Sequence, residues 1–322
     1  MKVGQLYDLN SFKKFLDHKK VEQEFKDSYA GLVLARNLQY VDPQLFEKHY
    51  PELAFFNTGI QADNSGGYAK RITSLRGRTT GRFTRAGDVS TEKGKIGRTH
   101  EDSDIIVLAK EAHSKWTDDE IKEAELQGVN LVNDYITGHT EVYQREVDEI
   151  GYWGITDEAD SYGLLNHPSF PVTSAANKAE NLTAQQMYDE IGDLIQEQWN
   201  DVNNTPQYRA VRVDMPVRVL NKLSRTILDT ASSAASVLVA LRANFPEVAF
   251  QGTFRAEAAN GAPSRTVAYS NTRQSMVMRI PLPLQVGEIV RLGSWDYQVD
   301  SKYRIAGLDV LERTSGRILT GL

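Results

Sequence analysis

The most regular hydrophobic pattern of the chain lies in residues 117–150. Apolar and aromatic side chains recur there every three or four residues, at the spacing of one face of a helix. The side chains expected to form its packed core are Ile121, Val132, Tyr135, Ile136, Tyr143, Val147 and Ile150. Thr117 and Glu120 stand at capping-box spacing at the start, and Gly151 follows where a left-handed C-terminal residue is favoured. The pattern predicts one long helix over residues 117–150.

A mixed α/β module is predicted between this helix and residue 265. Thr183 and Gln186 stand at capping-box spacing before another apolar helical face. Residues 208–213 and 248–254 have the composition of strands, and helical patterns lie between them. After the module, short strand-like runs alternate with Pro and Gly, and we expect these strands to return beside the long helix. The predicted fold class is therefore α+β.

Residues 61–104 differ from the rest of the chain. Glycine recurs through this segment, and only four aliphatic residues follow Tyr68 before residue 104: Ile72, Leu75, Val89 and Ile96. Such a segment buries too little apolar area to fold alone. Its partial alternation predicts two strands of a long hairpin. We expect this extended loop to be ordered by contacts with neighbouring chains.

Charge is distributed unevenly along the chain. The net charge is −6, but residues 68–98 carry nine basic residues against Asp88 and Glu92, a net +7, so the remainder carries −13. The basic residues are Lys70, Arg71, Arg76, Arg78, Arg82, Arg85, Lys93, Lys95 and Arg98. Three interpretations stay open for this segment: docking on the acidic body of another copy, contact with nucleic acid, or a solvated loop. We favour docking, because only Tyr68 and Phe83 could stack on bases.

Catalytic and metal-binding motifs are not found in the sequence. There is no phosphate-binding loop, dinucleotide fingerprint or nucleophile elbow. The chain has no cysteine, and its six histidines are not paired at metal-ligand spacing. His139 lies on the predicted long helix, where a satisfied core or interface histidine is the favoured interpretation. The N-terminus has no secretory signal pattern, and no apolar run is long enough to span a membrane. We expect no enzyme activity, no cofactor and no membrane association.

Short motifs in several places resemble the major capsid proteins of tailed bacteriophages with the Hong Kong 97-type fold. They are Tyr50-Pro-Glu-Leu53, Glu146-Val-Asp-Glu-Ile-Gly151, Tyr162-Gly-Leu-Leu-Asn-His-Pro168, Arg304-Ile-Ala-Gly-Leu-Asp-Val310 and Arg317-Ile-Leu-Thr-Gly-Leu322. The order of an arm, a glycine-rich hairpin, a long helix, an α/β insertion and returning strands is also similar to that family.

The resemblance implies a domain plan. Residues 1–60 would be the N-terminal arm, and residues 61–104 the extended loop that lies over an adjacent subunit. A peripheral domain would comprise residues 105–154 and 266–322, with the long helix as its spine. Residues 155–265 would form an axial domain near the capsomer centre.

The resemblance also implies partners and a location. Copies would assemble into hexamers and pentamers of a virion shell, built in the host cytoplasm around packaged double-stranded DNA. Scaffolding, portal and decoration proteins are further partners of such shells. Two alternatives remain at this point: a nucleic-acid-binding protein that uses residues 68–98, and the shell of a cellular encapsulin-type nanocompartment.

Overall fold

The computed structural model describes residues 53–84, 94–126, 128–156, 158, 160–230, 233–257 and 263–322. Most of the predicted N-terminal arm, up to residue 52, lies outside these ranges. The chain divides into two compact units. Within the described residues, the smaller unit is part of Glu120–Leu131, and the larger comprises parts of His49–Asp119 and Val132–Leu322.

The segment predicted as one helix over residues 117–150 forms two helices, so that prediction is wrong. They are α4 (Asp118–Leu126) and α5 (Leu131–Trp153). Gly128 between them has a φ of +77°. The amides of Gly128 and Val129 donate to carbonyls three and five residues earlier, at 3.0 and 2.9 Å. This is the Schellman arrangement, in which a left-handed glycine satisfies the last carbonyls and ends the helix.

The C-terminal end of α5 also differs from the prediction. The helix continues past Gly151 to Trp153, and Gly154, with a φ of +82°, is the left-handed residue that follows it. A Cβ on Gly151 would stand about 2.4 Å from the ring of Phe55. Gly151 is therefore needed for the close approach of Phe55 to the helix rather than for its termination.

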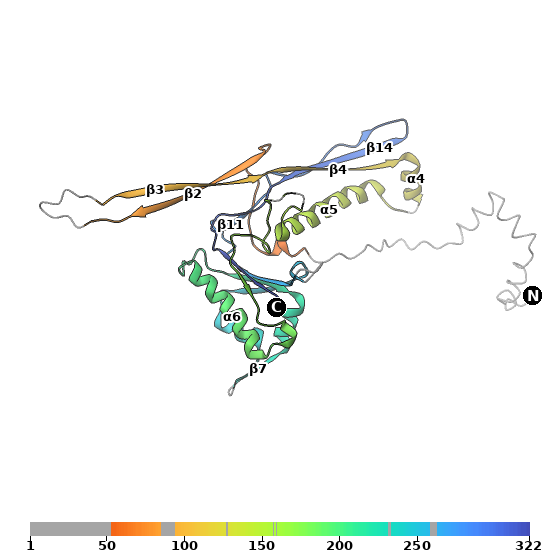
Figure 1. Ribbon diagram of the computed structural model, residues 1–322. Coiled ribbons are helices and arrows are strands. Elements are labelled where there is room, and N and C mark those ends of the chain that lie inside the picture. Colours follow the sequence, from red (N-terminus) through yellow and green to blue (C-terminus); the bar gives the residue numbers. More distant parts are fainter. Residues whose placement is uncertain are drawn as a thin grey trace, which may run out of the picture. The chain divides into compact units, whose positions relative to one another are not determined.

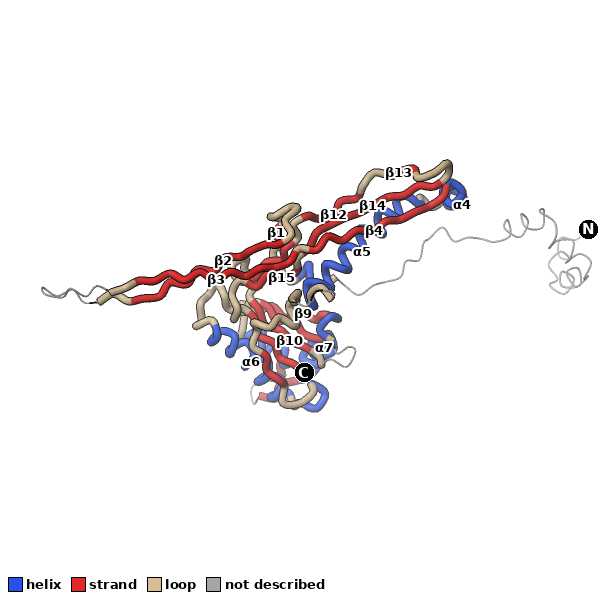
Figure 2. The backbone as a smooth tube through the Cα atoms, turned by 45° about the horizontal axis from the view of Figure 1, so that its top comes forward, coloured by secondary structure: helices blue, strands red, loops and turns tan. Residues whose placement is uncertain are grey.

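A long antiparallel strand pair lies beside α5. Strands β4 (Leu108–Thr117) and β14 (Asp296–Ile305) pair over ten residues, although they are far apart in the sequence (Figure 1). Strands β12 (Leu282–Val286) and β13 (Val290–Arg291) pair with the other edge of β14 (Figure 2). Strands β1 (Ala62–Asp63), β11 (Met276–Arg279) and β15 (Gly307–Val310) form a separate small sheet. In the sequence, β11 directly precedes β12 and β15 directly follows β14.

Aromatic contacts hold α5 to this strand pair. Trp116 at the end of β4 stacks on Tyr135, with ring centroids 5.2 Å apart, and Tyr143 meets Tyr303 of β14 edge-on at 4.9 Å. Further along, Val147 and Ile150 enter a core shared with strands β11, β14 and β15. The returning strand β14 thus lies beside the helix, as the sequence analysis expects.

The second large sheet has five strands in the order β5, β16, β10, β6, β9. Their bounds are Val172–Ser174, Gly316–Thr320, Arg265–Tyr269, Arg212–Pro216 and Ala249–Thr253. Its helices are α6 (Ala184–Asp201), α7 (Val217–Arg225) and α8 (Val237–Asn244). The predicted capping box of Thr183 and Gln186 starts α6. Two short strands, β7 (Ile227–Thr230) and β8 (Ser233–Ser236), and the 3-10 turns Phe55–Asn57, Ala179–Asn181 and Phe254–Ala256 complete the described elements.

The five-stranded sheet separates two cores. Helix α6 packs over β16 and β10, helix α7 over β6 and β9, and α8 contacts both helices. Side chains of β10 pack alternately on the two sides of the sheet. Ala268 belongs to the core under the helices, while Val267 and Tyr269 belong to the core that contains residues of α5. Strands β10 and β16 are part of this sheet, so the predicted division at residue 265 separates strands that pair.

A buried carboxyl joins the end of α5 to the five-stranded sheet. Asp214 of β6 is fully buried, and its Oδ2 accepts hydrogen bonds from the hydroxyls of Tyr152 and Tyr269, each at 3.1 Å. Its Oδ1 is buried without a hydrogen-bond partner among the described residues. Burial raises the pKa of Asp214 to about 6, although the charge of Arg212 and the two tyrosine hydrogen bonds oppose the rise.

This carboxyl predicts a pH dependence of stability. Because its pKa is about 6 when folded and 3.8 ordinarily, the folded state holds the proton more tightly, and stability falls as pH rises between these values. We expect the free energy of unfolding of the wild type to fall by about 2 kcal/mol over this pH range, and Asp214→Asn to abolish that fall. Urea denaturation of the unassembled subunit at pH 4.5 and pH 7.5 measures it. Asp193→Asn, at an exposed position, is the control; equal pH profiles for the wild type and Asp214→Asn contradict the prediction.

Candidate assembly surface

The extended hairpin predicted within residues 61–104 is present. It consists of β2 (Arg71–Gly81) and β3 (Ile96–Ile106), which pair antiparallel along their whole lengths and run as a narrow ribbon (Figure 1). The described ribbon pairs with no third strand. Leu75 is 72% exposed, and Phe83 beyond the end of β2 is 90% exposed. A two-stranded ribbon is marginally stable alone.

Most of the described basic side chains of the predicted docking set are exposed. These are Lys70, Arg71, Arg82, Lys95 and Arg98. Arg71 forms an ion pair with Asp104 across the hairpin at 3.7 Å. Only the main chain of Arg78 is described, and Arg85 and Lys93 lie outside the described residues. The hairpin therefore presents several cations to its surroundings.

Arg76 differs from the other members of that set. It is half-buried, and its Nη2 donates a hydrogen bond to the carbonyl of Val310 in β15. The side chain thus links the hairpin to the body of its own chain. The docking surface that we propose below leaves Arg76 out.

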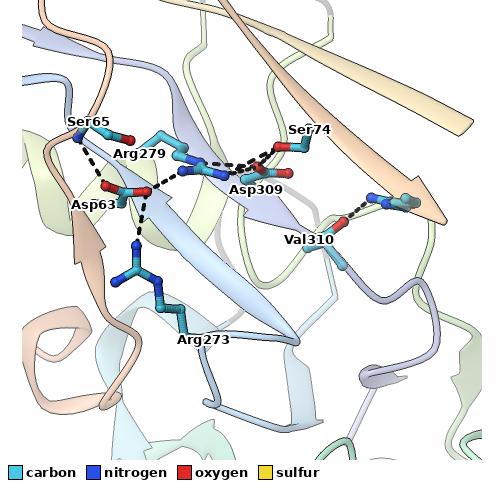
Figure 3. Close-up of polar contacts among 8 residues, drawn as sticks. Asp63, Ser65, Ser74, Arg273, Arg279, Asp309 and Val310 are labelled. Atoms are coloured by element: carbon cyan, nitrogen blue, oxygen red, sulfur yellow. Dashed lines mark hydrogen bonds and ion pairs between the residues drawn. The ribbon is translucent and has the colours of Figure 1, made fainter. Parts of the chain in front are cut away.

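A buried ionic cluster fixes the base of the hairpin to the body. Figure 3 shows Arg279 of β11 between two carboxylates, Asp63 and Asp309. The Oδ2 of Asp309 accepts from Nε and Nη2 of Arg279, both at 3.1 Å, and from the Ser74 hydroxyl of the hairpin at 2.6 Å. Burial raises the pKa of Asp63, but hydrogen bonds from Ser65 and the nearby arginines outweigh it and leave the pKa lowered. The cluster joins β1, β2, β11 and β15 at one point.

We expect Asp309→Ala to destabilise the subunit by about 3 kcal/mol. Asp309 is 1% exposed, and its removal leaves the buried guanidinium of Arg279 with only one of its two carboxylate partners, Asp63. Ser74→Ala removes only the hydroxyl and should cost about 1 kcal/mol. Urea denaturation of the unassembled subunit measures both changes. A cost for Asp309→Ala no greater than that of Ser74→Ala would show that the cluster does not hold the hairpin base.

This cluster was not predicted from the sequence. Its members are single charged residues inside otherwise apolar strands, as in Met276-Val-Met-Arg279 and Leu308-Asp309-Val310. Such an interruption is the signal that could have identified them, because buried charges are normally paired. The sequence could not show that Asp63 and Asp309 both pair with Arg279, because these two residues lie far apart in it.

The predicted core residues of the long helix are buried to different degrees. Val147 and Ile150 are 1% and 4% exposed. The half-buried members are Ile121 in the smaller unit, and Val132, Tyr135, Ile136 and Tyr143 in α5. The C-terminal half of α5 therefore carries its strongest packing.

His139 lies between two hydroxyls. Its Nε2 is 2.9 Å from the Oγ of Ser114 in β4, and its Nδ1 is 2.7 Å from the Oγ of Ser301 in β14. Within the described ranges, no group of three His, Cys, Asp or Glu residues could hold a metal ion. None of the described helices has the length and apolar character needed to cross a membrane.

Comparison with known proteins identifies the family. Residues 95–321, more than half of the chain, match the family described as "Major capsid protein". The chain belongs to the major capsid protein family. It is a structural subunit of a viral shell and is located in the virion, so the predictions of family and of a non-enzymatic role are confirmed. No curated protein sequence matches the chain.

Solved capsid structures share its fold. The capsid protein of Myoviridae phage XM1 is 42% identical, with a TM-score of 0.80, over 89% of this chain and 98% of that one. The capsid of a native GTA particle is 11% identical, with a TM-score of 0.65, over 91% and 99% of the two chains. The SrpI encapsulin of Synechococcus elongatus is 12% identical, with a TM-score of 0.58, over 90% and 95%. The Hong Kong 97-type fold is thereby confirmed, and the two distant matches bear on the fold alone.

Proposed function

We propose that this capsid subunit builds the head of a tailed double-stranded DNA bacteriophage, as hexamers and pentamers of an icosahedral shell. The likeness to the capsid of Myoviridae phage XM1, at 42% identity, supports the phage type rather than an encapsulin-type compartment. The observation that carries the assembly mechanism is the extended hairpin, which exposes Leu75 and Phe83 and has no third strand in the described part of the chain.

In this proposal the hairpin docks on an adjacent subunit. Its exposed cations face the acidic surface of a neighbour, because the segment that contains them carries +7 and the rest of the chain −13. Charge complementarity orients the contact, and each copy makes several such contacts, so weak single interfaces add up to a persistent shell. The ionic cluster around Arg279 holds the hairpin base while its distal part meets the neighbour.

The domain plan follows the resemblance with one change. Residues 105–154 and the strand pair beside α5 form the peripheral domain, and residues 155–265 form the axial domain. We assign β10 and β16 to the axial domain, because they pair with β6 and β5. Packaged DNA on the inner face, and scaffolding, portal and decoration proteins, complete the proposed set of partners.

Electron microscopy of the protein expressed alone and with its neighbouring genes tests this function. Closed shells of uniform diameter are the expected result. Salt-titrated DNA binding by unassembled subunits tests the nucleic-acid alternative, since a steep loss of affinity with salt indicates phosphate contacts by the hairpin. Absence of shells under both expression conditions, together with such a steep dependence, would overturn the proposal.

A further inference from the structure

One edge of the five-stranded sheet is open and acidic. Strand β5 forms this edge, and a groove of about 330 Å³ lies between it and α6. Four carboxylates and no basic residue line the groove: Asp189, Glu190, Asp193 and Glu197. Asp193 and Glu197 follow Asp189 at steps of four residues and Glu190 lies three residues before Asp193, which places all four on one face of α6, a helix without Lys or Arg.

The chain itself neutralises only part of this charge. Glu197 pairs with Arg317 at 2.6 Å, and Glu190 accepts a hydrogen bond from the amide of Ala176 at 3.1 Å. Within the described part of the chain, Asp189 accepts only from the neutral amide of Gln185, at 2.8 Å. The carboxylate of Asp193 is exposed and has no partner among the described residues. Asp189, Glu190 and Asp193 therefore have no cationic partner among the described residues, and their charges are left for an outside partner.

A basic helix covers the opposite edge of the same sheet. Strand β9 forms that edge, and α7 packs over it. The helix has three basic residues and no acidic one, and Arg218, Lys222 and Arg225 share one face. Arg218 pairs with Glu257 at 2.6 Å, and Lys222 donates to the carbonyl of Ala179. Arg225 is exposed, with no ion-pair partner in the described part of the chain.

We propose that neighbouring copies meet with the acidic α6–β5 edge of one against the basic α7–β9 edge of the next. This inference rests on the proposed function and names the contact that closes a capsomer ring. The two edges are different surfaces, so the contact is heterologous and propagates from copy to copy until the ring closes. A symmetric contact between two identical edges would oppose like charges and is disfavoured.

A second copy fits the acidic groove better than other partners do. Phosphate groups of nucleic acid would be repelled by four carboxylates. An unrelated basic protein could bind, but the complementary edge is present on every copy at the same concentration. The exposed side chain of Val172 in β5, 61% accessible, adds apolar area beside the charges. Charge and apolar contact together are typical of an interface between subunits.

Site-specific crosslinking tests the contact. The chain has no cysteine, so Gln196→Cys beside Asp193 on α6 and Asn221→Cys on α7 introduce the only thiols, at exposed neutral positions. In assembled shells of the double variant, a short bis-maleimide should produce a ladder of covalent products that ends at five and six copies. Each single-cysteine variant, which lacks one of the two edges, should give no ladder.

A charge swap provides an independent measurement. Asp193→Lys should lower shell yield about tenfold, and adding Arg225→Glu should restore it, because the pair is rebuilt with reversed signs. Shells that form without a ladder, or a swap without rescue, overturn this inference and leave the proposed function standing. Failure of the wild-type protein to form shells under either expression condition counts against the proposed function itself.

Discussion

The triple variant Arg82→Glu, Lys95→Glu, Arg98→Glu is expected to abolish shell formation while the subunit stays folded. Each reversal changes the charge by two units, so a hairpin that matched an acidic neighbour would repel it instead. All three side chains are exposed, and exposed substitutions away from buried partners usually change stability by about 0.5 kcal/mol or less. Sedimentation and electron microscopy measure assembly, and far-UV circular dichroism measures the fold.

The matched control keeps the charge and changes only the shape of the side chains. The Arg82→Lys and Arg98→Lys variants should assemble. Their shells should be less stable if these arginines make bidentate contacts with carboxylates, because lysine cannot make such contacts. Normal assembly of the Glu variant would show that the hairpin does not dock through charge. Loss of helical signal in that variant would instead show that these side chains stabilise the subunit itself.

Val147→Asp is expected to prevent folding of the subunit. Val147 lies in the core between α5 and its strands at 1% exposure, and the change places an unpaired charge there in addition to creating a cavity. The combined cost should be about 4 kcal/mol or more, a large part of the stability of an ordinary domain. The variant should accumulate as insoluble protein, and any soluble fraction should lack a cooperative thermal transition.

Val132→Asp is the control for position along the helix. The sequence alone places Val132 in the same packed face, yet it is half-buried in the first turn of α5. A negative charge near a helix N-terminus interacts favourably with the backbone dipole, so this variant should be soluble and lose about 1 kcal/mol or less. Equal damage from both substitutions would show that the burial of α5 is not graded along its length.

Local patterns in the sequence predicted the elements that local interactions determine. The periodicity that ends at Ile150 found α5, and the Thr183–Gln186 box placed the start of α6. The break at Gly128 was missed because the apolar spacing continues through it, although a left-handed glycine ends the helix there. Most of β4 was also missed, because Leu108–Thr117 is polar and half-exposed and its partner lies far along the chain.

The candidate assembly surface was predictable in part for the same reason. The partial alternation of residues 61–104 predicted the hairpin, and their shortage of aliphatic side chains indicated that the segment buries too little area to fold alone. The inward direction of Arg76 could not be known without the position of Val310, which comes from the opposite end of the chain. The acidic face of α6 and the basic face of α7 are visible in the sequence, but only the strand order places them at opposite edges.

The ladder between β4 and β14 has a consequence for synthesis of the protein. Residues 108–117 pair with residues 296–305, so the first partner leaves the ribosome long before the second exists. During that interval β4 is an unpaired edge, the kind of segment that promotes aggregation and engages chaperones. Closure of the sheet is therefore a late event, and nascent chains released before residue 305 would carry an open strand.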